Sequence, residues 1–394
     1  LNTCAIREHA EDRVFGNLGA LTHTKKENPE QVIALCGCMA QEPRVSERIR
    51  KSYPHVDLVF GPQALWKFPE LLWQVYETHK RVFSVQDEHG TIAEGIPVVR
   101  EKGVKAWVSI MYGCNNFCSY CIVPYVRGRE RSRDPQAVLA EVRQLVEAGY
   151  KDITLLGQNV NSYGNDLDLG YHFPDLLADI DQIPGEYLIR FMSSHPKDAT
   201  PRLFDVMAAS SHVAKQLHLP FQSGNDRVLK EMNRRYTRQQ YLDLVNYAKR
   251  VMPGLVLTSD VIIGFPGETE AEAMDTVSLV EEVGFDALFT FIYSPRPGTK
   301  AAAMPDPVTR AEKQKWFDRL LEVQNHMSAK LHAAYVGKTV RVLVDGESDD
   351  PEFPLTSRTE GNRLVRLKGD KALIGQFADV AVTGSNTWAL YGEA

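Results

Sequence analysis

Three cysteines near the middle of the chain constrain what it can fold into more than any other feature. Cys114, Cys118 and Cys121 have the spacing Cys-x-x-x-Cys-x-x-Cys. This spacing places three thiolates on one tight loop, which suits a four-iron, four-sulfur cube. Since a cube has four irons and the loop supplies three ligands, one iron stays open to a small molecule.

The open iron predicts a cofactor. It could chelate the amino and carboxylate groups of a molecule such as S-adenosylmethionine, with the aromatic Tyr120 beside it. Two other interpretations stay open: a structural zinc ion completed by a distant histidine, and three unrelated buried thiols. Zinc motifs usually come as two Cys-x-x-Cys pairs, so the spacing favours the cluster.

Composition indicates an ordinary soluble protein. The 394 residues allow two or three domains, and 43% of them are hydrophobic. No run of eighteen apolar residues and no signal peptide is evident, so we expect a cytoplasmic protein with no membrane contact. Six cysteines are too few for a disulfide scaffold. A net charge of −6 means that any nucleic-acid contact must come from local basic patches.

The predicted fold class is α/β, in three domains. Residues 1–85 alternate strand-like and helix-like stretches and predict an open α/β domain, which is incomplete because the chain begins without methionine at the end of a strand. In it, 31–35 and 56–60 read as strands and 63–76 as an amphipathic helix. A polar stretch from Gln86 to Gly103 reads as a linker.

Residues 102–335 predict a partial (β/α)6 barrel. Six apolar strands, each followed by a helical pattern, are expected near 107–111, 153–156, 188–192, 216–219, 256–263 and 287–292. Asp134 is expected to cap the first helix, and Thr309 with Glu312 to form a capping box at the last. The last helix is then expected to pack into the core through Trp316, Leu320, Val323, Met327 and Leu331.

Residues 336–394 predict a small antiparallel β-barrel. Short alternating strands at 339–344, 363–367 and 378–382 are separated by glycine-containing and acidic turns. Barrels of this size commonly bind RNA. We expect removal of this domain to weaken RNA binding more than cofactor cleavage.

Polar residues follow each strand of the predicted barrel. The active site of a parallel barrel gathers at the carboxyl ends of its strands, so these residues are expected to surround the cofactor. Amide and hydroxyl groups would bind its polar groups, and a glycine would let backbone approach the adenine. The candidate cofactor-binding residues are Tyr120, Gly157, Gln158, Asn159, Ser194, Gln222 and Gly264.

Two histidines and two arginine groups have less certain roles. His195 and His218 stand at strand ends, where a histidine is either a structural residue or a chemical one. The arginines suit phosphate contacts on an extended segment, or are solvated and paired with the surplus acidic residues. They are Arg127, Arg129, Arg131 and Arg133 after the cysteine loop, and Arg234, Arg235 and Arg238 after the fourth strand.

The remaining cysteines indicate a second cluster. Cys4 follows a short strand, and Cys38 stands where another strand meets a helix. Loops at one edge of a sheet can bring such residues together although they are far apart in sequence. Cys36 lies inside the strand, so it should be aimed differently from Cys38.

These strings resemble the methylthiotransferase family of radical S-adenosylmethionine enzymes over nearly the whole chain. The resemblance covers the cysteine loop and its continuation to Gly128, the string 157–161, and segments around Ser194, Gln222 and Gly264. The loop continuation and the string 157–161 favour tRNA-modifying members over those that act on a ribosomal protein. The C-terminal barrel would be the family's TRAM domain, and the central barrel its radical-SAM core.

The resemblance implies a reaction. S-adenosylmethionine, cleaved at the cluster of Cys114, Cys118 and Cys121, would yield a radical that removes a hydrogen from C2 of an isopentenylated adenine next to the tRNA anticodon. A methylthio group would then be attached there, with sulfur passing through a second [4Fe-4S] cluster. The implied partners are tRNA, a reducing protein such as a flavodoxin or ferredoxin, and a sulfur source.

The sequence departs from this family in one respect. Cys4 and Cys38 match the second and third ligands of the auxiliary cluster, whereas the Gly-Cys-x-x-Asn string of the first ligand is absent. We therefore expect a truncated sequence with an incomplete auxiliary cluster. Two alternatives to the leading hypothesis remain: a methylthiotransferase for another tRNA adenosine or a ribosomal protein, and a non-catalytic, zinc-stabilised RNA-binding protein.

Overall fold

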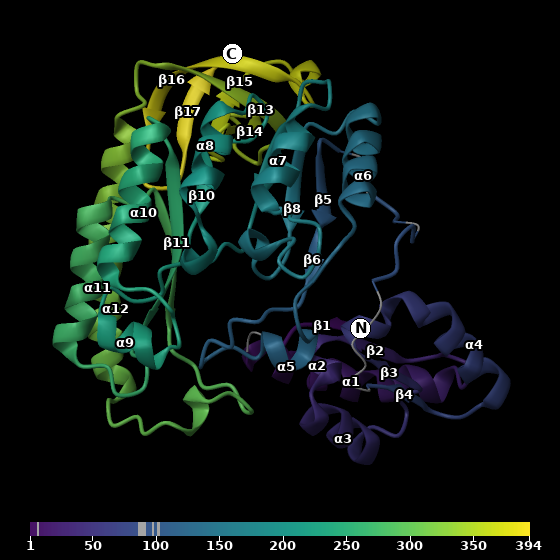
Figure 1. The fold of residues 1–394 in the computed structure, drawn as a ribbon. Helices are drawn as coiled ribbons and strands as arrows, with labels where there is room; N and C mark the ends of the chain where they lie inside the picture. The colour runs from purple at the N-terminus through teal and green to yellow at the C-terminus, as the bar shows by residue number, and fades with distance from the viewer. Residues whose placement is uncertain (6–7, 86–91, 97, 101–102) are drawn as a thin grey trace. The chain divides into compact units, whose positions relative to one another are not determined.

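The computed structural model describes residues 1–5, 8–85, 92–96, 98–100 and 103–394. It divides into two compact units (Figure 1). Unit 1 comprises Leu1–Val98, Tyr112–Arg131 and Ser294–Ala303, and unit 2 comprises Val99–Met111, Ser132–Tyr293 and Met304–Ala394. Parts of the predicted linker, 86–91, 97 and 101–102, lie outside the described residues, and the predicted boundaries 1–85, 102–335 and 336–394 stay a prediction.

Unit 1 contains an open, parallel, four-stranded sheet. Its order is β1 (Asn2–Thr3), β2 (Ala34–Gly37), β3 (Leu58–Phe60) and β4 (Val82–Ser84). Buried Leu35, Met39, Ile49 and Val59 form a core between sheet and helices. The helices are α1 (Glu8–Glu27), α2 (Cys38–Gln41), α3 (Pro43–Ser52) and α4 (Phe68–Thr78). This arrangement agrees with the predicted open α/β domain.

The predicted helix 63–76 is wrong in its first third. Residues Pro62–Lys67 form a 3-10 turn, η1, and the α-helix begins only at Phe68. Pro69 explains the break, because a proline inside a helix lacks the N–H donor and clashes with the carbonyl four residues earlier. At the start of α4 the same proline is tolerated.

Unit 2 confirms the six predicted barrel strands, arranged as two parallel three-stranded sheets. The first sheet contains β5 (Lys105–Ser109), β8 (Asp152–Leu156) and β9 (Leu188–Phe191), and the second β10 (Gln216–His218), β11 (Val256–Ile263) and β12 (Ala287–Ile292). A parallel bridge from Ile189 to Val213 links the two sheets. The short strands β6 (Met111–Tyr112) and β7 (Arg131–Ser132) flank the cysteine loop in sequence.

Helices cover one side of these strands (Figure 1). They are α6 (Pro135–Glu147), α7 (Phe173–Asp181), α8 (Pro201–Ala209), α9 (Asp226–Glu231), α10 (Arg238–Val251), α11 (Glu270–Val283) and α12 (Arg310–Ala333). Alternate strand residues such as Val108, Leu155 and Leu257 join the core shared with the helices. The residues between them, such as Trp107 and Phe289, therefore face the inner side of the curved sheets.

Local signals of the helices are largely confirmed. Asp134 accepts a hydrogen bond from the backbone of Ala137 at the start of α6, and Thr309 and Glu312 form the predicted capping box of α12. Among the described helices, none is both long and apolar enough to cross a membrane.

The predicted apolar stripe of α12 is correct only at its beginning. Trp316 and Leu320 are buried, and the half-buried Val323 packs against the same core, whereas Met327 and Leu331 are only half-buried. The buried positions of the second half are polar: Gln324, Ser328 and His332. Each bonds a backbone carbonyl, respectively of Phe285 (3.1 Å), Asp286 (2.8 Å) and Asn386 (2.8 Å). The helix leaves the apolar core there and crosses a polar junction.

A closed five-stranded barrel forms the C-terminal part of unit 2, as predicted. Its order is β13 (Thr339–Glu347), β14 (Leu355–Thr359), β15 (Leu364–Lys368), β17 (Leu390–Glu393) and β16 (Phe377–Ser385). Two of these strands, β14 and β17, were not expected. The barrel is also not wholly antiparallel, because β17 pairs with β15 in parallel. Val342, Val344, Val365 and Val380 lie in its core.

The tip of the β14–β15 hairpin packs against the amino ends of the strands of the large barrel. Arg190, 6% exposed, donates to Asp152 Oδ1 (3.1 Å) and to the carbonyls of Thr359 (3.1 Å) and Glu360 (2.5 Å). A Cβ atom on Gly361 would lie 2.2 Å from Val256 Cγ2. The C-terminal barrel therefore closes this end of the large barrel.

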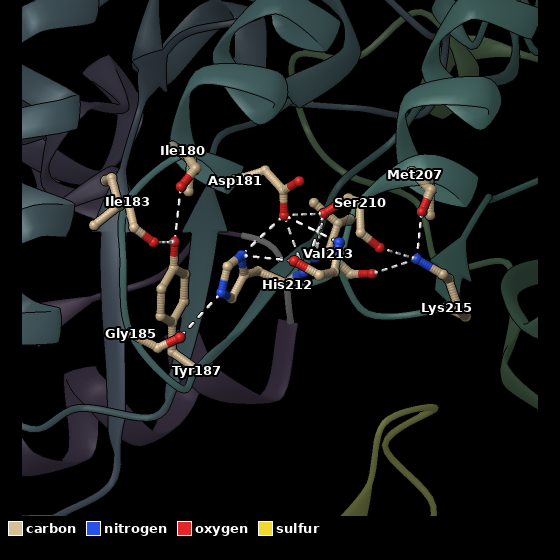
Figure 2. A network of polar contacts seen from close by, with 11 residues as sticks. Ile180, Asp181, Ile183, Gly185, Tyr187, Met207, Ser210, His212, Val213 and Lys215 are labelled. Carbon is tan, nitrogen blue, oxygen red and sulfur yellow. Dashed lines mark hydrogen bonds and ion pairs between the residues drawn. The ribbon is translucent and has the colours of Figure 1, made fainter.

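A polar network fixes the chain just before β10, where the two sheets meet. Figure 2 shows Asp181 at the end of α7 accepting bonds from Ser210 Oγ (2.5 Å) and from the backbone (3.0 Å) and ring (2.9 Å) nitrogens of His212. The Tyr187 ring stacks on His212 at 4.2 Å, and Lys215 Nζ donates to three carbonyls. Such groups satisfy the carbonyls that helix ends leave open.

Candidate functional site

The cysteine loop lies in unit 1 and is tightly folded. Cys114 and Cys118 are 8% and 9% exposed, and Cys121 is half-buried. The backbone N–H of Cys114 donates to Gly128 O (3.1 Å), and that of Cys121 to Cys118 O (2.9 Å). Gly113 has a φ of 79°, and a Cβ atom there would lie 2.0 Å from Arg129 O. Only glycine permits this approach.

The donor set of the loop fits the predicted cluster. Three thiols on one short loop are the ligands that an iron–sulfur cube requires, and each binds a different iron. A single metal ion is a different case: in the described part of the chain, no three His, Cys, Asp or Glu side chains are arranged around one such ion. Tyr120 is half-buried next to Cys121, and the neighbouring Ser119 carbonyl accepts a bond from the backbone of Ala301 (2.8 Å).

Strand register brings Cys4 and Cys38 to one sheet edge. Thr3 in β1 pairs with Gly37 in β2, so Cys4 and Cys38 both follow directly after paired residues. Cys36 pairs with Asn2 inside the sheet and packs beside Leu58 and Phe60. It lines the same cavity as Cys38, so its different aim stays a prediction. Burial raises the pKa of the Cys36 thiol.

Cys38 also contacts the helix that follows the cysteine loop. This helix, α5 (Val123–Arg127), begins two residues after Cys121. Cys38 lies in a buried cluster with Ile122 and Val126, and Arg127 Nε donates to its Sγ at 3.2 Å. A cavity of about 340 Å³ lies at this place in unit 1, lined by Thr3, Cys36, Cys38, Trp66, Tyr112 and Arg127 among others. The helix that follows the cysteine loop therefore packs against a cysteine of the predicted second group.

In unit 2, the loops after the strands contain buried polar atoms that form no hydrogen bond. They belong to Asn159, Asn161, Ser194, His195, Glu268 and Tyr293. Buried polar groups in proteins are nearly always paired, so such a group of exceptions indicates a place where a ligand supplies the partners. Asn159 and Ser194 were predicted, and the half-buried Gln158 lies beside them. The polar character of this end suits S-adenosylmethionine.

Two of these loops contain strained backbone. Ser193 after β9 has a φ of 70°, and Gln222 after β10 has a φ of 67°. Gln222 is buried, and its backbone bonds to Asp260 O (3.0 Å) and Ile262 N (2.9 Å) in β11. Positive φ at non-glycine residues is uncommon and concentrates at functional sites.

The two predicted glycines have a structural reason that the sequence did not indicate. A Cβ atom on Gly157 would lie 2.6 Å from Met111 Cγ, and one on Gly264 would lie 2.4 Å from Lys313 Cδ. Gly264 also has a φ of 72°. The space beside Gly264 is thus filled by the lysine side chain, and its approach to an adenine stays a prediction.

His195 and His218 have different surroundings. Burial, together with the positive charge of Arg234, lowers the pKa of His195 and keeps it neutral. Its Nδ1 accepts from the backbone of Lys197 (3.2 Å), so Nε2 carries the proton, and Nε2 has no partner. His218 is held by Thr258 Oγ1 (3.0 Å) and lies 3.5 Å from Asp260 Oδ1. The geometry favours hydrogen bonding to a bound ligand for His195 and a structural role for His218.

Sequence reasoning missed Asn161 and Glu268 as candidates. Glu268 is fully buried, its Oε2 accepts from the backbone of Gly264 (2.5 Å) and Phe265 (3.1 Å), and its Oε1 has no partner. Burial raises the pKa of Glu268 to about 7. Asn161 follows the second predicted barrel strand and Glu268 follows the fifth. Their positions after strands could therefore have identified them as candidates.

For most of these arginines the structure shows contacts within the protein, as the second interpretation expects, and phosphate binding stays a prediction. Arg127 lies in a helix and contacts Cys38, and Arg133 pairs with Glu141 (2.7 Å). Arg234 is buried and donates to Pro220 O (2.6 Å), while Arg238 pairs with Glu282 (2.8 Å). These cations hold the fold together. Arg129 and Arg235 are exposed.

Comparisons with known proteins cover the whole chain. Family models match the radical SAM superfamily at residues 108–280, the uncharacterized protein family UPF0004 at 1–61 and the TRAM domain at 333–394. Three relatives bear the name tRNA-2-methylthio-N(6)-dimethylallyladenosine synthase. That of Acetivibrio thermocellus is 50% identical over 392 residues, and those of Thermoanaerobacter sp. and Clostridium botulinum are 47% and 48% identical. The three alignments cover all of this chain. They cover 82%, 83% and 87% of the three relatives, in the same order.

Solved structures share the fold at low identity. The radical S-adenosylmethionine methyltransferase TsrM of Kitasatospora setae has a TM-score of 0.54 and 16% identity, over 72% of this chain and 62% of that one. The cobalamin-dependent radical enzyme OxsB has a TM-score of 0.52 and 14% identity, over 83% and 47%. The likeness to these structures shows the fold alone. From the full-length relatives, the chain belongs to the radical S-adenosylmethionine superfamily and, within it, to the family of tRNA-2-methylthio-N(6)-dimethylallyladenosine synthases.

Proposed function

We propose that this chain transfers a methylthio group to C2 of N6-isopentenyladenosine next to the anticodon of tRNA. The names of relatives that are 47–50% identical over the full chain support this reaction. The observation in the structure that carries the proposal is the contact between Arg127 and Cys38, because it brings the helix after the cysteine loop against a cysteine of the second group. A reaction that needs two clusters requires such a meeting place.

Each residue group has a separate task in this proposal. Cys114, Cys118 and Cys121 hold one [4Fe-4S] cluster, and Cys4 and Cys38 supply ligands of a second. When bound, the first cluster and S-adenosylmethionine supply the one-electron chemistry that removes the C2 hydrogen. Arg127 keeps the Cys38 sulfur in place through its 3.2 Å contact.

The buried polar groups of unit 2 bind the cofactor in this proposal. Asn159 Oδ1 accepts a hydrogen bond from it, and Ser194 Oγ and His195 Nε2 donate to it, because these atoms are buried without a protein partner. Gln158 and Gln222 add amide groups, and Gly157 and Gly264 shape the loops. Closing these atoms off from water makes their hydrogen bonds to a ligand stronger.

The proposed partners follow from the reaction. They are tRNA, a reducing protein such as a flavodoxin or ferredoxin, and a sulfur source, and the proposed location is the cytoplasm. In tRNA, the anticodon loop offers unstacked bases that side chains can reach, unlike bases in a duplex.

Nucleoside mass spectrometry of tRNA tests the reaction. Cells that lack this protein should lose 2-methylthio-N6-isopentenyladenosine and accumulate the unthiolated nucleoside. Expression of the wild-type gene should restore the product, and expression of Cys118→Ala should not, since the cube would lose an anchor. Cys36→Ala is the matched control and should restore the product, because Cys36 lies inside the sheet.

Three results would redirect or contradict the proposal. Unchanged 2-methylthio nucleosides in the deletion strain would exclude a tRNA substrate and favour a ribosomal protein. A colourless, zinc-containing protein after anaerobic reconstitution would favour the zinc-stabilised RNA-binding protein, and retained 5′-deoxyadenosine production by Cys118→Ala would contradict the ligand assignment.

A further inference from the structure

Unit 2 contains a cavity of its own. It lies at the amino ends of the barrel strands, opposite the loops that follow the strands. Its volume is about 390 Å³, within the range of small-molecule sites. Gln216, Val256 and Asp286, at the beginnings of β10, β11 and β12, line one side, with Phe289 above them. The last helix and the C-terminal barrel line the other side. The cavity therefore belongs to the junction between the two barrels.

Buried polar atoms without hydrogen bonds mark this cavity as they mark the strand-end loops. Gln324, 6% exposed, donates through Nε2 to Phe285 O (3.1 Å) and Ser328 Oγ (2.8 Å), whereas its Oε1 has no partner. Arg363, 8% exposed, pairs with Asp286 through one terminal nitrogen, whereas its Nε has no partner. Both residues line the cavity. A fitting ligand thus offers one donor and one acceptor.

An exposed tryptophan stands at the same cavity on a rigid turn. Trp388 is 75% exposed, although the turn that carries it is firmly held. Asn386 Oδ1 accepts from the backbone of Trp388 (2.8 Å) and Ala389 (2.7 Å), and Asn386 O accepts from His332 in α12 (2.8 Å). A large exposed indole on a firmly held turn offers a surface on which a flat ligand can stack.

We infer that this cavity takes one unpaired nucleobase of the RNA, with its face on Trp388 and its edge toward Gln324 and Arg363. A base is flat, has both donors and acceptors on its edge, and stacks on aromatic side chains. Arg358 is one-third exposed, lines the cavity and lies 3.7 Å from Asp345 Oδ2 through its Nε, so its terminal nitrogens are the part that would meet the adjoining phosphate. The inference rests on the proposed RNA partner and concerns a base other than the one that reacts.

Binding of an anticodon stem-loop RNA to the reconstituted protein tests the inference. Fluorescence anisotropy should show about tenfold weaker binding for Trp388→Ala and nearly full binding for Trp388→Phe, since stacking on one base is lost and then restored. Trp73→Ala is the matched control, because Trp73 is 64% exposed on α4 and does not line the cavity. It should bind as the wild type does.

A second measurement uses the wild-type sequence, so it does not depend on how a variant folds. With 5-fluorotryptophan incorporated, the ¹⁹F resonance of Trp388 should shift on addition of the stem-loop, while that of Trp73 should not. An unshifted Trp388 resonance in protein that binds RNA would overturn the inference. If the wild-type protein does not bind the stem-loop, the proposed function fails instead.

Discussion

The two ends of the large barrel in unit 2 treat their buried polar groups in opposite ways. At the carboxyl ends of the strands, Asn159, Ser194, His195 and Glu268 each keep a buried atom without a hydrogen bond. At the amino ends, all three side-chain nitrogens of Arg190 donate, to Asp152, Gln216 and two carbonyls of the C-terminal barrel. The first end is arranged for a ligand, and the second for stability.

This difference has an energetic meaning. A buried polar atom without a partner costs about 1–3 kcal/mol, so the carboxyl end weakens the empty fold. A buried charged network that is fully paired at least avoids this cost. The exceptions at the amino end, Gln324, Arg358 and Arg363, all line the proposed base cavity. The comparison therefore predicts which substitutions change stability and which change ligand binding.

Removal of residues 336–394 should have the largest effect. It would expose this end of the large barrel and remove the partners that Thr359 and Glu360 give Arg190 and that Arg363 gives Asp286. Because breaking one buried ion pair costs about 3–5 kcal/mol, we expect a loss of roughly 5 kcal/mol or more. Circular dichroism should show melting at least 10 °C lower, or no cooperative transition.

This result would replace the expectation drawn from the sequence, namely that the deletion mainly weakens RNA binding. Cleavage of S-adenosylmethionine should fall as well, because the barrel itself is weakened. An unchanged melting temperature would show that contacts with the C-terminal barrel do not stabilise the large barrel.

Arg190→Ala should have the next largest effect, a loss of about 3–5 kcal/mol in the free energy of unfolding. The substitution leaves the carboxylate of Asp152, which is 4% exposed, without its counter-charge. Urea denaturation followed by fluorescence measures the loss. Arg202→Ala breaks an exposed pair with Asp175 and should cost less than about 1 kcal/mol. Equal losses for the two variants would contradict the comparison.

Glu268→Gln should remove a pH dependence of stability at the carboxyl end. The pKa of Glu268 is raised by burial to about 7 from an ordinary 4.5, so the folded chain holds a proton that the unfolded chain releases between these values. Stability should therefore fall with rising pH in this window by up to about 1.4 kcal/mol per pH unit. The difference between wild type and variant at pH 5, 6 and 7 measures it. A constant difference would exclude a protonated Glu268.

Ser194→Ala should have the smallest effect on stability, a change within about 1 kcal/mol, because its hydroxyl has no partner to lose. Its affinity for S-adenosylmethionine should fall about tenfold, the value of one hydrogen bond. Ser210→Ala is the matched control: its hydroxyl bonds Asp181 at 2.5 Å in the network of Figure 2. That variant should lose about 1–2 kcal/mol of stability and keep its affinity.

Local signals in the sequence predicted the large barrel well. The strands carry apolar runs, and Asp134, Thr309 and Glu312 cap helices through neighbours in sequence. The carboxyl-end residues Asn159 and Ser194 were found for the same reason, since they follow strands directly. Cys4 and Cys38 were placed correctly at one sheet edge, because parallel strands end together.

Hydrogen bonds between residues far apart in the chain could not be predicted from the sequence. Nothing near Arg234 indicates that it bonds the carbonyl of Pro220, and nothing near Gln324 indicates the junction that α12 crosses. Strand β14 was missed because its polar residues Thr356 and Arg358 alternate with only one large apolar residue, Leu355. These features depend on which distant segment of the chain packs against the residue, and the neighbouring sequence carries no signal of that.

The fit of Gly361 against Val256 limits how this architecture can be rearranged. Any side chain at 361 would overlap the valine, and the neighbouring carbonyls must meet Arg190. A chimera that exchanges only the last sixty or so residues with those of a distant homologue would bring a mismatched hairpin to the mouth of the barrel. Productive recombination between such genes therefore requires the hairpin and the strand beginnings to be inherited together.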